Sequence, residues 1–263
     1  MLLPTKTTFT KTAYIYCKCM IKFFRRIRQQ LISENKTGKY LKYAIGEIVL
    51  VVIGILIALS INNWNENRKL QNEELKLLFD IKTNLETNLV NFENDTLLNH
   101  QDVIQYLKIE EYINNNLPYN NELDNAFGRL TFWGGPFITS TAYNSLQSKG
   151  LDIISNETLK NAIVDMHEVQ FSILVNDYDK SEWNLNQTVV TPFFSKHIRR
   201  LHNESLFLSR PNDFESLKQN EEFKNLLSMI IRQRKRGFEF YKAIMNSIKN
   251  LIQDIDIELQ SRQ

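Results

Sequence analysis

Histidine and cysteine are the residue types most often found in metal sites and in nucleophilic catalysis. This chain has four histidines and two cysteines. Cys17 and Cys19 form a Cys-x-Cys pair, but the sequence has no second pair to complete a tetrahedral zinc site. No two histidines are four residues apart, and His167-Glu168 lacks the second histidine of a zinc-protease motif. The sequence therefore predicts no metal site.

Motifs for phosphate binding and acyl transfer are absent as well. The chain contains no G-x-G-x-x-G, no G-x-x-x-x-G-K-[ST] and no G-x-S-x-G. Aspartate and glutamate are abundant, but their helix-surface spacing indicates solvation rather than acid–base pairing. We expect a non-enzymatic protein without a cofactor. The alternative is an enzyme or enzyme subunit whose site matches no motif, with His167 as the first residue to test.

Two other clusters carry chemically active side chains. One is a basic run within a long helical pattern, where we expect a solvated face; it consists of Arg232, Arg234, Lys235 and Arg236. The other is a stretch of flexible backbone at residues 132–137, which holds the aromatic side chains Phe132, Trp133 and Phe137. These aromatics line a ligand groove in one interpretation and form a plain hydrophobic lid in the other.

Long helices must position these side chains, because the turn residues that other folds need are scarce. The 263 residues include only eight glycines and five prolines, which argues against an all-β fold or a series of βαβ units. Both cysteines precede Met20, so the rest of the chain has no disulfide to stabilise it. The prediction is an all-α fold.

Residues 44–61 are apolar or small, apart from Glu47. Aromatic residues mark both edges, with Tyr40 and Tyr43 on one side and Trp64 on the other. The 21 steps from Tyr43 to Trp64 span about 31 Å in a helix, close to the thickness of the bilayer hydrocarbon. We predict a transmembrane helix at residues 43–63, after a non-structural leader at 1–19 and a juxtamembrane segment at 20–42, and before a helical domain at 64–263.

The segment at 20–42 has the pattern of a basic amphipathic helix lying on an anionic lipid surface. Its expected headgroup contacts are Lys22, Arg25, Arg26 and Arg28; the alternative is a solvated leader without lipid contact. Residues 1–43 hold ten Lys or Arg and one acid, a net charge of +9, which leaves −7 for the remainder of a chain whose total is +2. The positive-inside rule then predicts a cytoplasmic N-terminus, and the acidic domain argues against nucleic-acid binding.

Three residues of the span are candidates for contact with another membrane helix. Glu47 lies one turn inside Tyr43; it either reaches the interface, stays protonated, or pairs with a polar group on a neighbouring helix. Gly54 and Ala58 form a small-xxx-small pair that permits close helix approach. The sequence therefore predicts the lipid bilayer as a partner, and a homo-oligomer or a second membrane protein as a candidate partner through the span.

Helical periodicity continues without a breaker from Asn65 to about Ile113, so the transmembrane helix is expected to run on into the domain as a stalk. Its predicted core face contains Leu78, Ile81, Leu85, Leu89, Phe92, Val103, Ile104, Leu107 and Ile109. Shorter helical patterns follow at 123–133, then from cap candidates at residues 139–141 up to Gly150, and from Asn156 after a Ser155 cap. The last of these has Leu159, Ile163, Met166, Val169 and Ile173 on its apolar face. A long helix is predicted from about Asn220 to Leu259, and its core face contains Phe223, Leu227, Ile230, Ile231, Phe238, Tyr241, Ile244, Ile248, Leu251 and Ile255. We expect a bundle of long antiparallel helices.

Several runs resemble an uncharacterised family of Gram-negative membrane proteins, known only as a domain of unknown function. These runs are residues 20–28, Ser33-Glu-Asn-Lys, Tyr43-Ala-Ile-Gly-Glu-Ile-Val-Leu-Val-Val-Ile-Gly-Ile-Leu-Ile-Ala-Leu, Ile61-Asn-Asn-Trp-Asn-Glu and residues 141–159. The resemblance implies no activity. It implies that residues 1–19 are an upstream extension, and that the C-terminal domain is periplasmic and held in the inner membrane by a single pass.

The run from Gly46-Glu47 also resembles the hydrophobic helix of type IV pilins, whose buried glutamate pairs with a neighbouring N-terminal amine. The register departs from that family, because here the glutamate follows the glycine directly, whereas in pilins it is the fifth residue after it. The leading hypothesis is a membrane-anchored, extracytoplasmic helical module that senses or scaffolds through protein contacts. A pilin-like filament subunit is the third alternative, after the enzyme.

Overall fold

A computed structural model of the protein describes residue 29 and residues 37–201 and 208–262. The chain divides into two units, Met1–Lys69 and Leu70–Gln263. Helix α2, Thr37–Asn114, contributes residues to both, without a break in its helical backbone. The predicted leader at 1–19 and the headgroup contacts Lys22, Arg25, Arg26 and Arg28 lie outside the described residues.

In the first unit, α2 carries the apolar segment recognised in the sequence. Every side chain from Ile48 to Ile61 is exposed. Among the described residues, α2 is the one helix long and apolar enough to cross a membrane. An exposed, uninterrupted apolar surface of this length is costly in water and favourable in lipid.

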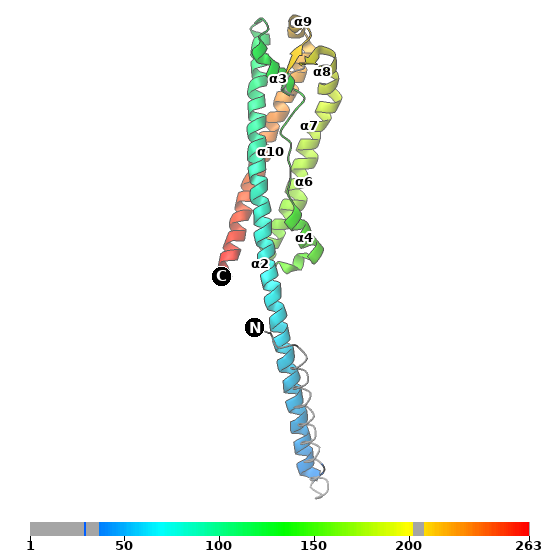
Figure 1. The fold of residues 1–263 in the computed structure, drawn as a ribbon, viewed down its shortest axis with the longest axis vertical. Helices are drawn as coiled ribbons and strands as arrows, with labels where there is room; N and C mark the ends of the chain where they lie inside the picture. Colours follow the sequence, from blue (N-terminus) through cyan, green and yellow to red (C-terminus); the bar gives the residue numbers. More distant parts are fainter. Residues whose placement is uncertain (1–28, 30–36, 202–207, 263) are drawn as a thin grey trace, which may run out of the picture. The chain divides into compact units, whose positions relative to one another are not determined.

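The second unit is built on three long helical segments, which confirms the all-α prediction (Figure 1). They are α2 from Leu70 onward, a continuous segment at 157–197, and α10, Glu221–Ser261. Contacts fix their directions. The 157–197 segment runs parallel to α2, since Ser155 bonds Glu74 and Tyr178 lies at Asn99. Helix α10 runs antiparallel to α2, with Arg262 at Glu74 and Tyr241 at Asp95.

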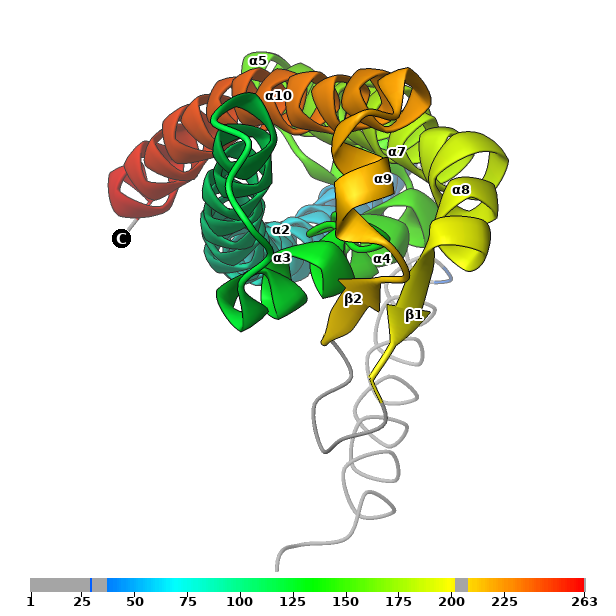
Figure 2. The ribbon, with the colours of Figure 1, turned by 90° about the horizontal axis from the view of Figure 1, so that it is seen from above.

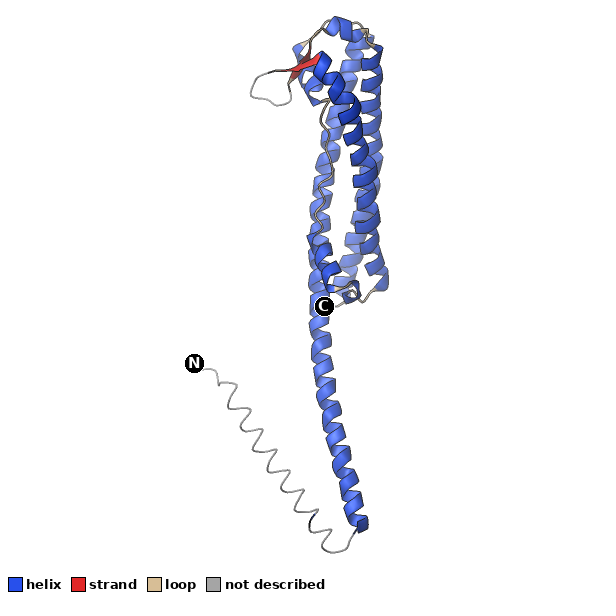
Figure 3. Ribbon diagram, turned by 90° about the vertical axis from the view of Figure 1, so that its right-hand side faces the viewer, coloured by secondary structure: helices blue, strands red, loops and turns tan. Residues whose placement is uncertain are grey.

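The prediction that the long helices are antiparallel is therefore wrong for one pair. An extended strap at 130–140 returns along α2 before the next long helix begins, and this connection makes α2 and the 157–197 segment parallel (Figure 3). Before the strap come η1, Asn121–Leu123, and α3, Asp124–Arg129. The predicted helix at 123–133 therefore ends at Arg129, and the chain from there to Ser140 is mostly extended.

Short elements close the two ends of the unit. Helices α4, Thr141–Lys149, and η2, Leu151–Ile153, follow the strap. At the other end, an unpredicted hairpin pairs β1, Ile198–Arg200, with β2, Ser209–Pro211, and places Arg199 opposite Arg210 (Figure 2). Helix α9, Phe214–Lys218, then leads into α10.

Helix caps account for several of these boundaries. Asn220 accepts a hydrogen bond from the Phe223 amide and starts α10 where the sequence predicted. Gly150 has a φ of 107° and ends α4, as predicted. The predicted Ser155 cap is wrong. Asn156 caps the next helix through the Leu159 amide, while Ser155 bonds Glu74 with both its amide and its hydroxyl.

The 157–197 segment alternates between α-helical and π-helical turns. Its parts are α5, Glu157–Val164; η3, Asp165–Gln170; α6, Phe171–Ile173; η4, Leu174–Asp179; α7, Lys180–Leu185; η5, Asn186–Val190; and α8, Thr191–His197. A π turn bonds residue i to i+5 and shifts which residues face inward. Val169 and Ile173, predicted as core, are therefore exposed, and Phe171 and Leu174 are buried instead.

The core consists of two apolar clusters. The first surrounds Phe92 and Tyr241, whose ring centroids are 5.6 Å apart, and it includes Leu78, Leu146, Ile163 and Ile248. The second surrounds Phe223, stacked 6.0 Å from Phe127, and it includes Tyr106, Phe193 and Ile230. The core face predicted for α10 is confirmed except at Phe238, which is half-buried.

Candidate functional site

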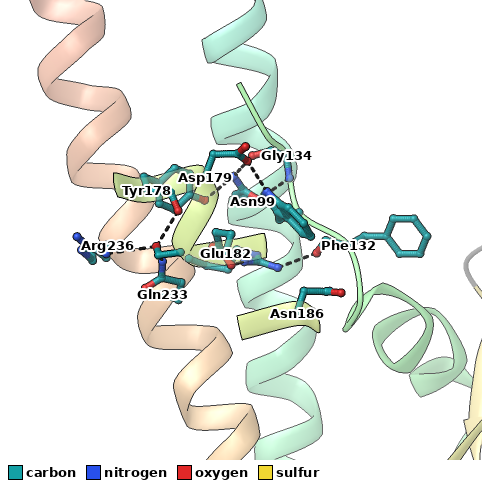
Figure 4. A network of polar contacts seen from close by, with 12 residues as sticks. Asn99, Phe132, Gly134, Tyr178, Asp179, Glu182, Asn186, Gln233 and Arg236 are labelled. Atoms are coloured by element: carbon teal, nitrogen blue, oxygen red, sulfur yellow. Dashed lines mark hydrogen bonds and ion pairs between the residues drawn. The ribbon is translucent and has the colours of Figure 1, made fainter. Parts of the chain in front are cut away.

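A belt of polar side chains separates the two apolar clusters at the middle of the second unit. Each of the three long helical segments contributes polar side chains between the clusters, and so does the strap (Figure 4). We call this set the polar belt; its members are Asp95, Asn99 and Asp102 of α2, Arg129, Trp133 and Gly134 before and within the strap, Tyr178, Asp179 and Glu182 of the middle segment, and Arg234 and Tyr241 of α10. Buried polar groups require internal partners, so the pairing of each one determines what the belt can do.

Arg234 and Glu182 form an ion pair in the centre of the belt. The Arg234 side chain is 2% exposed and that of Glu182 is 1% exposed. Arg234 also donates a hydrogen bond from Nη2 to the Phe132 carbonyl, 2.8 Å away, and lies over the Trp133 ring. The expectation that the basic run is a solvated face is therefore wrong at Arg234. Charge pairing across two helices, which the sequence spacing does not encode, buries this residue.

Asp102 is a second fully buried carboxylate, paired with Arg129. Arg129 contacts both carboxylate oxygens, and its Nη2 lies 3.0 Å from Oδ2. Burial raises the pKa of Asp102 from its usual value, and hydrogen bonding to Arg129 opposes that shift. Glu74 is likewise buried and accepts hydrogen bonds from Ser155 and Arg262. The prediction that the acidic residues are uniformly solvated is wrong for these carboxylates.

Asparagine side chains of α2 bond the strap backbone. Asn99 accepts from the Gly134 amide at 2.8 Å and donates to the Gly134 carbonyl at 3.0 Å. Asn88 makes the same pair of contacts with Thr139, at 2.7 and 3.0 Å. Asn84 accepts from the Ala142 amide at 2.9 Å. A side-chain amide can replace a missing strand in this way, because it offers one donor and one acceptor in the plane of the peptide group.

Two glycines allow the close contacts at the belt. A Cβ on Gly134 would lie 2.9 Å from the Asp95 carbonyl oxygen, so glycine lets the strap approach the α2 backbone. A Cβ on Gly237 would lie 2.5 Å from Cζ of Tyr178, whose ring is fully buried. Gly237 therefore makes room on α10 for the tyrosine that bridges the belt to the first apolar cluster.

Asp95 is a belt carboxyl with a raised pKa. Burial raises the pKa of Asp95 to about 6, the neighbouring Asp179 carboxylate adds to the shift, and hydrogen bonding from Tyr241 opposes it. The Tyr241 hydroxyl lies 3.3 Å from Asp95 Oδ2, and Asp179 accepts a hydrogen bond from the Trp133 indole at 2.8 Å. The belt therefore contains a carboxyl that titrates in mildly acidic solution beside groups that hold the strap.

His167, the residue named for the enzyme alternative, lies in the first apolar cluster and outside the belt. Its ring stacks on Tyr143 at 4.2 Å and meets Phe171 edge-on at 5.0 Å. Burial lowers the pKa of His167 to about 4, against the opposing effect of Glu168, so the ring is neutral at pH 7. Its Nδ1 lies 3.4 Å from the Ser140 hydroxyl, and among the described residues its Nε2 has no hydrogen-bond partner. These contacts are those of a packed aromatic ring.

The three aromatic residues of the predicted groove or lid do not converge. Trp133 points into the unit, where it meets Trp183 edge-on at 6.3 Å and bonds Asp179. Phe137 points outward and is 74% exposed. Phe132 lies near the hairpin, with the Arg200 guanidinium 5.5 Å from its ring. Two surface hollows in the described part of the unit are lined by other residues.

The membrane-contact candidates all lie on the first part of α2. Ala58 is exposed, Glu47 is half-buried, and a Cβ built on Gly54 would meet no atom within 4 Å. Across residues 37–201 and 208–262, no group of three or more His, Cys, Asp or Glu is placed to hold a metal ion.

Comparison with protein families gives a match over residues 47–202 to a family of unknown function, DUF6090. The chain belongs to this family. The family resemblance predicted from the sequence is confirmed over that range, which begins at Glu47 and includes the strap, α4 and the middle helical segment. No curated protein and no solved structure matches the chain.

In this DUF6090 member, nearly every polar group of the belt is bonded to another group of the same chain. In the described part of the chain, the exceptions are Oε1 of Glu182 and Nε of Arg234, which have no hydrogen-bond partner, and Nη1 of Arg234, whose contact is the ion pair itself. Such an arrangement fixes the register of three helices and a strap. The sequence did not predict the belt because its members from different elements, where they bond each other, are 27 to 146 residues apart. A local signal was the polar break in the apolar face of α2 at Asn99 and Asp102.

Proposed function

We propose that the protein is a single-pass membrane module with its N-terminus in the cytoplasm and its helical unit in the periplasm. It is proposed to work through contacts with other proteins, as a sensor or scaffold of the inner membrane, and not through catalysis. The proposed partners are the bilayer, through residues 43–63, and a second protein chain, through Glu47, Gly54 and Ala58.

Helix α2 is the observation that carries this proposal. Its first part exposes a continuous apolar surface of membrane-spanning length, and its later turns carry the inner face of the helical unit. The +9 charge of residues 1–43 supports a cytoplasmic N-terminus, because basic residues near a span are retained on that side. The net charge of −7 over the rest of the chain supports protein contacts rather than nucleic-acid contacts.

The polar belt supports a non-catalytic role. Two of its carboxylates, Asp102 and Glu182, pair with arginines inside the unit, and the Arg234–Glu182 pair is sealed from solvent. Buried pairs of this kind are better suited to specifying one arrangement of helices than to binding a substrate. Asp95 has a raised pKa and shares the Tyr241 hydroxyl with the Gly134 carbonyl of the strap, so its protonation is the input that we propose for a sensor.

Photo-crosslinking in membranes tests the proposal. A photoreactive residue replaces Glu47, Gly54 or Ala58, and Leu56, which is exposed on the opposite side of the helix, serves as the matched control. We expect protein adducts from the three candidate positions and mostly lipid adducts from Leu56. Recovery of lipid adducts alone from all four positions would contradict a protein partner at the span.

A further inference from the structure

The outer side of α2 in the helical unit carries an apolar stripe. Four large apolar residues, Phe79, Val90, Leu97 and Ile104, are 53% to 59% exposed. They follow one another at steps of eleven, seven and seven residues, so each step returns to the same side of the helix. Leu98 and Leu107 flank the stripe and are also exposed. Ile104 and Leu107 were predicted as core residues; Asp102, Val103 and Tyr106 take the inward positions instead.

A stripe with this period is typical of paired helices. It extends over residues 79–104, about 38 Å of helix, and its last three members keep the seven-residue spacing of a coiled-coil seam. Exposed amides alternate with its apolar members at Asn94 and Gln101, also seven residues apart. Amide residues in the seam of a coiled coil fix register and the number of helices.

Charged residues beside the stripe have ion-pair partners within the same chain. Glu86 lies 3.7 Å from Lys82, which also pairs with Asp256 at 2.6 Å, and Lys108 pairs with Glu122 at 2.7 Å. Glu93 lies 3.7 Å from Lys249 of α10. The face that would meet a partner is thus mostly apolar and amide-bearing, and its two glutamates each have a lysine of the same chain within 4 Å.

We propose that this stripe pairs with the same stripe of a second copy of the chain, in parallel and in register. An in-register pair places Asn94 against Asn94 and Gln101 against Gln101, and an amide can donate to and accept from its own kind. The apolar residues then meet in self-complementary layers, as a two-fold interface requires. The parallel direction rests on the membrane anchoring proposed above, because two chains inserted in one membrane point the same way.

Disulfide crosslinking of the full chain in native membranes tests the pairing. Single cysteines replace Val90, Leu97 or Ile104 in a background in which Cys17 and Cys19 are serine, and the membranes are oxidised briefly. Met229 of α10, which is 48% exposed, is replaced in the same way as a control for random collision. We expect a disulfide dimer at all three stripe positions, with at least a tenfold higher yield than at Met229.

A charge in the stripe provides the second measurement. Leu97→Lys, combined with Ile104→Cys, should lower the dimer yield at least fivefold, and Met229→Lys should leave it unchanged. Both substituted side chains are exposed, so circular dichroism is expected to show the same helix content in each variant. Equal yields at stripe and control positions, or crosslinks only to other proteins, would each overturn the proposal.

Fractionation of the same cells separates this inference from the proposed function. A chain that sediments with membranes but gives no stripe-specific dimer contradicts the pairing and leaves the anchoring intact. A chain found in the soluble fraction contradicts the anchoring, whatever its crosslinks.

Discussion

Removing one partner of the buried Arg234–Glu182 pair should destabilise the helical unit strongly. Both side chains are at most 2% exposed, so the remaining charge would lie in the core without its counter-ion. Breaking a buried pair of this kind costs about 3–5 kcal/mol. For Glu182→Gln we expect the lower end, about 3 kcal/mol, because Arg234 retains the Phe132 carbonyl and the nearby Asp102 carboxylate.

Arg234→Met should lie nearer the upper end, because it leaves the Glu182 carboxylate buried and also removes the bond to the strap. Replacing both, as Glu182→Leu with Arg234→Met, removes both charges and should cost less than the sum of the single changes by about 2 kcal/mol or more. The assay is urea unfolding of the full chain in detergent micelles, followed by near-ultraviolet circular dichroism. Single changes within about 0.5 kcal/mol of wild type, or strictly additive costs, would refute the burial and pairing described here.

Three further changes test other parts of the unit with the same assay. Gly237→Ala should destabilise by about 1–2 kcal/mol, because the clash with Tyr178 outweighs the better helix propensity of alanine; a stabilised variant would show that the ring moves aside. The pKa of His167 is lowered to about 4, so its contribution to the free energy of unfolding is fully present above pH 6.5 and is lost as the pH falls towards 4. His167→Phe should remove up to about 3 kcal/mol of this loss of stability in acid. An unchanged dependence of stability on pH would argue against the burial of the ring. The pKa of Asp95 is raised to about 6, so its contribution to the free energy of unfolding is present below pH 4 and is lost as the pH rises through 6. The stability of Asp95→Asn relative to wild type should therefore increase from pH 4 to pH 7. A decrease over that range would contradict the raised pKa.

Local sequence signals predicted the helices well. The structure confirms three such signals: the apolar periodicity of Leu78, Ile81 and Leu85, the Asn220 cap, and the end of a helix at Gly150. Each signal depends on residues within one or two helical turns. Their success follows from the short range of the interactions involved, because caps and helix faces depend on neighbours three or four residues away.

The errors arise where distant segments decide the outcome. Arg234 is solvated by every local criterion, but a carboxylate 52 positions away holds it in the core. Val169 and Ile173 have the spacing of a core face, but π turns rotate them outward. Asn84, Asn88 and Asn99 look like surface asparagines in the sequence, because the backbone that they bond, in the strap and at the start of α4, lies 35 to 58 residues further along the chain.

Membrane topology tests the central claim most directly. A periplasm-dependent phosphatase is fused after Gln263 in one strain and after Lys42 in another, and membranes are washed with alkaline carbonate. We predict high phosphatase activity for the first fusion, little for the second, and retention of the full-length fusion in the washed membranes. High activity for the Lys42 fusion with little for the Gln263 fusion would contradict the orientation, and release of the chain by carbonate would contradict the anchor.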